Sequence, residues 1–185
     1  MTDPPAPDPT EPPPASVGRD AWLLDGTAVT VRPIGASDGP ALVRFHEGLS
    51  DETTRLRFFT RHPVLTAREV ARFTQVDHRD REALVMEAFD QLIAVGRYDR
   101  APGSPEAEVA FVVGDAWQGH GAATLLFGAL ADQARRVGVA RFVADTLADN
   151  HTMLDVFEHT GLVVGRQVDC GVVHVTLDLA RGLTA

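Results

Sequence analysis

The stretch AEVAFVVGDAWQGHGAATLLFGALADQARRV, residues 107–137, decides the fold of this chain. Its first part, Val109 to Val113, is a run of β-branched, aromatic and small apolar residues, which predicts a buried strand. Apolar residues then recur at helical spacing; they are Ala123, Leu126, Phe127, Leu130, Ala134 and Val137. Gly138 stands where a C′ glycine would end that helix. The stretch therefore predicts a strand, a tight turn and an amphipathic helix.

The turn between the predicted strand and helix reads Gln118-Gly119-His120-Gly121-Ala122-Ala123. Small residues let the backbone approach a ligand closely, and the first amides of a helix have no acceptor inside the helix. Because the positive end of the helix dipole lies there too, the turn predicts a phosphate site. An ordinary strand-to-helix turn is the alternative, since neither a Walker A loop nor a complete G-x-G-x-x-G pattern is present.

The pattern Gln-x-x-Gly-x-Ala after a strand, with a carboxylate at Glu108, resembles motif A of the GNAT superfamily of acyl-CoA-dependent N-acyltransferases. The resemblance covers about residues 28 to 179. It implies an α/β (α+β) fold with a mixed, mostly antiparallel sheet of about six to seven strands, flanked by about four helices. One parallel pair of strands is expected to splay apart and admit the pantetheine arm of acetyl-CoA.

The resemblance also implies a set of coenzyme A-binding residues. They are Phe111, Val112, Val113, Gln118, Gly119, His120, Gly121, Ala122, Ala123, Thr124 and Asn150. The first three are expected to hold pantetheine through the backbone, and 118–123 to hold the pyrophosphate. Asn150 matches an asparagine that many relatives direct at pantetheine, although a helix N-cap is its alternative role. His120 occupies a variable motif position and is expected to face solvent.

Glu108 is the candidate general base. A lysine amine has a pKa near 10.4, so only about one in a few thousand is neutral at pH 7. A carboxylate near the nitrogen supplies the missing proton acceptor, directly or through water. The alternative for Glu108 is an exposed carboxylate or an ion-pair partner. Since Glu108 and Val113 would face opposite sides of a regular strand, a β-bulge between them is expected to restore the geometry.

Other groups have secondary roles in this hypothesis. Asp77, His78 and Glu82 are fallback bases, expected at the surface or in turns. A backbone N–H near Val112 or Val113 is the expected donor to the developing oxyanion. Many relatives carry a tyrosine that reprotonates the leaving thiolate, but the matching residue here is Phe157, and Tyr98 is an unsupported substitute. No metal-ligand cluster stands out, so no metal is expected.

The rest of the chain predicts the order β-α-α-β-β-β-α-β-α-β-β. Strands are expected at 28–32, 83–89, 92–98, 141–147, 162–168 and 172–179, and helices after Asp38, after Ser50, from Thr66 and over 150–160. The segments 50–59 and 74–79 are similar to the substrate side of bacterial protein-lysine acetyltransferases (Pat-like), for which acyl-CoA synthetases are typical acceptors. Residues 1–18 contain most of the prolines and are expected to be a disordered tail before a single domain, 19–185.

Composition narrows the function further. A net charge of −9 argues against nucleic acid as a partner and suits a cationic amine. All 17 basic residues are arginine, so the chain has no lysine of its own to acylate. No apolar run has the roughly 20 residues of a membrane helix. With no signal-peptide pattern and the single thiol of Cys170, placed in a turn, we expect a cytoplasmic protein, monomeric or homodimeric.

The leading hypothesis is an N-acetyltransferase that moves an acetyl group from acetyl-CoA, or a propionyl group from propionyl-CoA, to a protein lysine by direct transfer. A second hypothesis is acetylation of a small amine. A third, from another class, is an inert acyl-CoA-binding sensor module. Replacing Glu108 with Gln separates the enzymes from the sensor. An enzyme should lose turnover and still bind coenzyme A, whereas a sensor has no turnover to lose.

Overall fold

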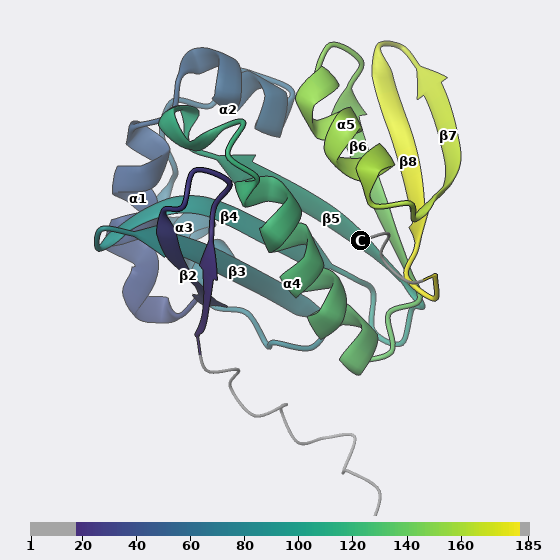
Figure 1. Ribbon diagram of the computed structural model, residues 1–185, viewed down its shortest axis with the longest axis horizontal. Helices are drawn as coiled ribbons and strands as arrows, with labels where there is room; N and C mark the ends of the chain where they lie inside the picture. Colours follow the sequence, from purple (N-terminus) through teal and green to yellow (C-terminus); the bar gives the residue numbers. More distant parts are fainter. Residues whose placement is uncertain (1–17, 182–185) are drawn as a thin grey trace, which may run out of the picture.

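The computed structural model describes residues 18–181, which are organised around an eight-stranded mixed sheet (Figure 1). The strands are β1 (Arg19–Trp22), β2 (Ala28–Pro33), β3 (Arg81–Ala88), β4 (Gln91–Asp99), β5 (Glu106–Val113), β6 (Arg141–Leu147), β7 (Val163–Asp169) and β8 (Val172–Asp178). The α-helices are α1 (Gly39–Glu47), α2 (Asp51–Phe58), α3 (Ala67–Thr74), α4 (Ala122–Arg136) and α5 (His151–His159). The predicted disordered tail lies, apart from Gly18, outside the described residues.

Helices cover both faces of the sheet. The predicted apolar stripe of α4 is buried against β3, β4 and β5, and α4 crosses one face of the sheet in Figure 1. A second, smaller core lies on the opposite face, where Leu42 of α1 and Val70 of α3 pack against Val85 and Val95. None of the helices within 18–181 is long and apolar enough to cross a membrane.

The strand order is β1-β2-β3-β4-β5-β6-β8-β7, and β5 and β6 are a parallel pair. Their pairing is short: Glu106 faces Arg141, Ala107 faces Phe142 and Glu108 faces Val143. Beyond Glu108 the two strands continue without pairing, so they diverge. This divergence confirms the predicted splayed pair, and it leaves the edge of β5 over 109–113 without a neighbouring strand.

Local signals predicted most element ends correctly. Ser50 caps α2 by accepting a hydrogen bond from the Thr53 amide, and Thr66 and Glu69 form the predicted capping box of α3. Gly138 follows α4 with φ of +81°, as a C′ glycine does. The Cys170-Gly171 turn joins β7 to β8, and Cys170 is exposed as expected.

The described sheet has one strand more than the largest predicted number. The described residues hold five α-helices where the resemblance implied about four, and all five match helices predicted individually from the sequence. The additional strand is β1, which pairs antiparallel with β2. It was overlooked because RDAW is short, polar and exposed. The signal was the Asp25-Gly26 pair that follows, since Gly26 takes φ of +84° and Asp25 accepts a hydrogen bond from the Thr27 amide.

The β-bulge expected between Glu108 and Val113 is absent, and that prediction was wrong. The register of β4 with β5 runs unbroken from Asp99 opposite Glu108 to Ala94 opposite Val113. The strand needs no extra residue because its edge is open where it splays from β6. Both faces of β5 therefore border the same cavity without a change in register.

Candidate active site

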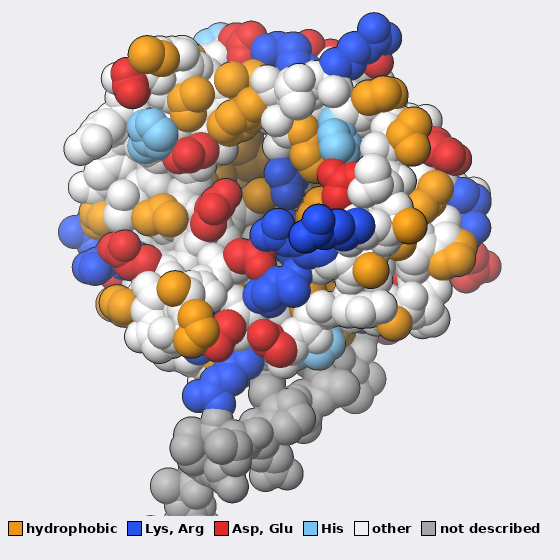
Figure 2. Space-filling model, turned by 180° about the vertical axis from the view of Figure 1, so that it is seen from behind, with side chains coloured by type: hydrophobic (Ala, Val, Ile, Leu, Met, Phe, Trp, Pro, Cys, Tyr) orange, Lys and Arg blue, Asp and Glu red, His pale blue; other side chains and the backbone are white. Residues whose placement is uncertain are grey.

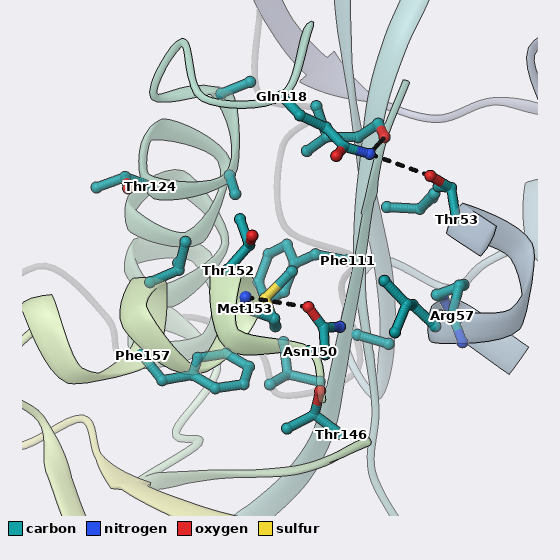
Figure 3. A pocket seen from close by; sticks show the side chains of 18 of the residues that line it. Thr53, Arg57, Phe111, Gln118, Thr124, Thr146, Asn150, Thr152, Met153 and Phe157 are labelled. Carbon is teal, nitrogen blue, oxygen red and sulfur yellow. Dashed lines mark hydrogen bonds between the residues drawn. The ribbon is translucent and has the colours of Figure 1, made fainter. Parts of the chain in front are cut away.

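A cavity of about 550 Å³ occupies the wedge between β5 and β6. This volume lies within the range of about 300–1,000 Å³ that is typical of small-molecule sites. Residues of α2 line one side, and Asn150, Met153 and Phe157 of the α5 region face them across the cavity (Figure 3). Every predicted site residue except His120 borders it.

The mouth of α4 presents free backbone donors. Gly121 precedes the helix with φ of +83° and no side chain caps the helix start. The first hydrogen bond of the helix joins the Leu125 amide to the Gly121 carbonyl at 3.1 Å, so the amides of 122–124 lie ahead of it and have no helical acceptor. In the same turn Gly119 takes φ of +78°, and a Cβ there would meet no atom within 4 Å. This arrangement suits an anionic group such as a phosphate.

His120 differs from the expectation of a solvent-facing residue. Its side chain is half-buried, and Nδ1 lies 3.0 Å from Oδ2 of Asp25 in the β1–β2 turn. The His120 carbonyl also accepts a hydrogen bond from the Leu24 amide at 3.0 Å. These contacts attach the β1–β2 turn to the glycine-containing turn, so His120 fixes the position of the loop from outside the cavity.

A hydrogen-bond network joins α2 to the loop after β5. Asp115 accepts hydrogen bonds from Ser50 Oγ at 2.5 Å and Thr53 Oγ1 at 2.8 Å. Gln118 Nε2 donates to Thr53 Oγ1 at 3.1 Å and to the Val113 carbonyl at 3.2 Å. Burial by itself raises the pKa of Asp115, but the hydrogen bonds from Ser50 and Thr53 outweigh it and lower that pKa. Asp115 is therefore an ionised acceptor at neutral pH.

Opposite this network, polar groups of β6 and α5 enter the cavity. Asn150 caps α5 by accepting a hydrogen bond from the Met153 amide at 3.2 Å (Figure 3). Its side-chain nitrogen makes no hydrogen bond to any residue that the structure describes, so it is available to donate. Thr146 is 2% exposed, and its Oγ1 has no hydrogen-bond partner among the described residues. A buried hydroxyl without a partner costs free energy, and a polar ligand in the cavity would satisfy it.

Glu108 lies on the exposed end of β5 at the edge of the cavity. Within 18–181 its carboxylate makes no hydrogen bond and no ion pair, in contrast to Glu106, which binds Arg141 at 2.8 Å. The alternative role of ion-pair partner therefore does not fit Glu108. The negative charge of Glu108 helps to stabilise the charged form of Arg57 on α2.

The fallback bases lie outside the cavity lining. Asp77 accepts hydrogen bonds from the amides of Arg79, Asp80 and Arg81 and shapes the loop before β3. Glu82 is 1% exposed and bonds His78 at 2.8 Å, so the expectation of a surface or turn position was wrong for Glu82. Burial raises the pKa of Glu82, partly offset by His78.

The two aromatic residues discussed for thiolate protonation are both buried. Tyr98 donates its hydroxyl to the Arg79 carbonyl at 3.1 Å and does not border the cavity, and burial raises its pKa. Phe157 is 2% exposed and packs edge-on against Phe111 and Phe127. Neither ring offers a proton at this site.

Four contributors were not named as site residues from the sequence, although two of them lie in the segment 50–59 that resembles the substrate side: Thr53, Arg57, Asp115 and Thr146. Thr53 and Asp115 are 62 residues apart in sequence, so no local pattern links them. Ser50-Asp51-Glu52-Thr53 was recognisable as the start of a helix, but the contact of that start with the loop after β5 depends on the tertiary fold. Within the described residues, no group of three or more His, Cys, Asp or Glu side chains could hold a metal ion.

The chain resembles known acetyltransferases along most of its length. A family model described as "Acetyltransferase (GNAT) domain" matches residues 28–163. The chain is 34% identical over 170 residues to Acetyltransferase Pat of Mycolicibacterium smegmatis, which covers 90% of this chain and 48% of that protein. The chain thus spans about half the length of this curated relative.

Solved structures agree with this. The GNAT domain of S. lividans PAT superposes with a TM-score of 0.83 at 39% identity, over 87% of this chain and 96% of that one. The structure of yncA from Salmonella typhimurium, solved with its cofactor acetyl-CoA, has a TM-score of 0.67 at 20% identity, over 82% and 94% of the two chains. At that identity the likeness concerns the fold alone.

Proposed function

The chain belongs to the GNAT acetyltransferase family, and from this premise we propose that it transfers an acetyl group from acetyl-CoA directly to a protein lysine. One observation carries the proposal: the open edge of β5 joins free helix amides and an unpaired carboxylate in a single cavity. The amides suit an anion, and the carboxylate suits an amine that must lose a proton.

The cavity contains donors along its length that fit acetyl-CoA. The amides of 119–124 would hold its pyrophosphate, and the unpaired edge over Phe111–Val113 would bind the pantetheine arm as an added strand does. The free nitrogen of Asn150 and the hydroxyl of Thr146 would bind polar groups of the same arm. When bound, acetyl-CoA supplies an acetyl group that is activated as a thioester.

Glu108 is the proposed general base. It accepts the proton of the incoming ammonium, directly or through one water, so that the neutral nitrogen can attack. A backbone N–H of Val112 or Val113 would stabilise negative charge on the acyl oxygen. Phe157 cannot donate a proton, so we propose that solvent protonates the thiolate. A thiolate tolerates this delay because thiol pKa values are near 8.5.

Protein lysine is the proposed acceptor class because two similar proteins carry the name Pat and because α2 and its flanks resemble the substrate side of that group. The absence of lysine from this chain simplifies the test. Purified chain is incubated with acetyl-CoA and, in separate reactions, with the protein fraction and the small-molecule fraction of a cell lysate, and acetyl-lysines and acetylated small amines are identified by mass spectrometry. Every acetyl-lysine then belongs to an acceptor and none to the enzyme.

We expect new acetyl-lysines on a limited set of lysate proteins, absent from the reaction without the chain. If only the small-molecule fraction becomes acetylated, the acceptor is a small amine and the protein-lysine proposal is wrong. If neither fraction is acetylated while coenzyme A binds, the domain is a sensor, and the proposed transfer is contradicted.

A further inference from the structure

Arg57 lies on α2 at one side of the cavity, across from Asn150 and Phe157 (Figure 3). It borders the main cavity together with Glu108, and it also borders a smaller adjoining cavity together with Arg97. Its guanidinium lies 4.9 Å from the centre of the Phe58 ring. On the face of the molecule shown in Figure 2, arginine side chains gather beside a hollow with hydrophobic side chains in its depth.

Arg57 lacks the partners that its neighbours have. Arg55, on the same helix, binds Glu52 at 2.7 Å and Asp149 at 2.9 Å, and Arg97 binds Asp99 at 3.1 Å. Within the part of the chain that the structure describes, Arg57 makes no hydrogen bond and no ion pair. Asp99, the carboxylate closest to Arg97, also binds Arg81 at 2.8 Å and is therefore already shared.

The surroundings of Arg57 are unfavourable for a charge without a partner. Burial, and then the positive charge of Arg97, lower the pKa of Arg57 to about 10, although Glu108 and Asp99 oppose the change. Arg57 still carries its charge at neutral pH. A half-buried charge without a hydrogen-bonded partner costs free energy. An anion that entered the cavity and bound the guanidinium would offset this cost.

Among the residues that the structure describes, the two unpaired charges that border the cavity, Arg57 and Glu108, have opposite signs. Glu108 attracts the acceptor ammonium, and Arg57 offers a planar pair of donors that matches a carboxylate. The other charged side chain that borders the cavity, Asp145, lies 2.6 Å from His174. An acceptor with a carboxylate close to its amine would satisfy both free groups together.

We propose that Arg57 binds a carboxylate of the acceptor, so that amines with a carboxylate nearby are preferred. This inference rests on the proposed acetyl transfer. The carboxylate has two possible sources: an Asp or Glu beside the target lysine in a polypeptide, or the carboxylate of a free amino acid. Both present the same group to the guanidinium, and substrate pairs can distinguish them.

The test compares kcat/KM for matched acceptors. Peptides with one lysine carry Glu, Gln or Arg beside it, and free lysine is compared with lysinamide. The variants are Arg57→Gln and Arg57→Glu, and Arg61→Gln is the matched control, because Arg61 is exposed and binds Asp51 outside the cavity. Coenzyme A affinity, measured by calorimetry, verifies that each variant is folded.

In whichever acceptor class is acetylated, peptides or free lysine, we expect wild type and Arg61→Gln to have a kcat/KM about tenfold higher for the acceptor with the carboxylate. The difference should lie mainly in KM. Arg57→Gln should remove the preference, and Arg57→Glu should favour the peptide with Arg. A preference that survives in Arg57→Gln, or an equal loss for all acceptors, contradicts the inference.

The two proposals can fail separately. If free lysine shows the Arg57-dependent preference and peptides are not substrates, the protein-lysine proposal is wrong and the role of Arg57 stands. If peptides are substrates without any preference, the protein-lysine proposal stands and the role of Arg57 is wrong. If no acceptor is acetylated, both are wrong.

Discussion

Gln118 Nε2 donates a hydrogen bond to Thr53 Oγ1 at 3.1 Å, which joins the loop before α4 to the first turn of α2. The same nitrogen reaches the Val113 carbonyl at the end of β5 at 3.2 Å. The contact therefore spans the two sides of the cavity, since α4 presents its amides on one side and α2 carries Arg57 on the other. The motif glutamine therefore links the two sides of the cavity.

A double-mutant cycle measures this contact. Gln118→Ala and Thr53→Val should each lower the free energy of unfolding, and the double variant should lose less than the sum. We expect a coupling of about 0.5–1.5 kcal/mol, typical of one hydrogen bond between neutral groups. Urea unfolding of the four proteins gives the value. Strict additivity would mean that the two side chains do not interact in solution.

Gly121→Ala should weaken coenzyme A binding. Residue 121 has φ of +83°, and an added Cβ would lie 3.1 Å from the Leu24 side chain, at the start of α4. The matched control is Gly103→Ala, because Gly103 has φ of +74° and an added Cβ there would meet no atom within 4 Å. Both variants should lose about 1 kcal/mol of stability to backbone strain.

Only Gly121→Ala should raise the Kd for coenzyme A, by about tenfold, because only this residue borders the cavity. Calorimetric titration of the two variants decides the matter. Equal affinities in Gly121→Ala and Gly103→Ala would place the pyrophosphate elsewhere than at the α4 amides.

Thr146→Val should stabilise the free protein and weaken the complex. Among residues 18–181 the buried hydroxyl of Thr146 has no hydrogen-bond partner, so its removal should raise the free energy of unfolding by about 1 kcal/mol. The Kd for coenzyme A should rise about fivefold through the loss of one hydrogen bond. Thermal unfolding and calorimetry measure the two effects.

Thr160→Val is the control for that experiment. Thr160 is also buried, but its Oγ1 donates to the Phe157 carbonyl at 2.6 Å. This variant should be destabilised and bind coenzyme A as wild type does. If both variants lose stability, the Thr146 hydroxyl has a partner in solution, and its assignment to the ligand is wrong.

Asp38→Asn should reduce stability in a pH-dependent way. Asp38 accepts two hydrogen bonds from Arg32 at 2.8 Å each and one from the Gly35 amide at 2.7 Å. The Arg32 guanidinium holds the pKa of Asp38 below its usual value, although burial opposes this. The folded pKa thus lies below the unfolded value of about 3.9.

The stability that this ion pair contributes is therefore present above about pH 4 and is lost as the pH falls through the folded pKa. At pH 7 we expect a loss of about 1–3 kcal/mol in the variant, reduced from the fully buried case because Arg32 is partly exposed. Guanidinium unfolding at pH 7 and pH 3 checks this. A difference between the two proteins that does not shrink at the lower pH contradicts it.

Local sequence patterns predicted the parts of the fold that depend on local chemistry. Capping residues correctly predicted the helix starts at Ser50 and Thr66, and a glycine after the apolar stripe correctly predicted the C′ position at Gly138. The strand β6 over 141–147 was also predicted correctly. The resemblance to the family motif also indicated the splayed pair of strands. It named Glu108 and Asn150 as site residues, and both border the cavity.

Long-range features were not predictable from patterns. The bulge expected in β5 is absent because the register with β4 is continuous, and pairing of that kind depends on two strands rather than one. Arg57 has no ion-pair partner among the described residues, whereas its neighbours Arg55 and Arg97 bind Asp149 and Asp99. A sequence gives the number of charges, but the fold decides which of them stay unpaired.

The measurement that tests the account most directly is the kcat of Glu108→Gln beside that of Glu106→Gln at saturating acetyl-CoA, with coenzyme A affinity measured for both. Glu106 is two positions away on the same strand, is bound to Arg141 and lies outside the cavity lining. We predict that Glu108→Gln loses about 10²–10⁴-fold in kcat with unchanged coenzyme A affinity, and that Glu106→Gln stays near wild type. A Glu108→Gln variant that keeps its kcat would contradict the account, because Glu108 would then not act on the amine.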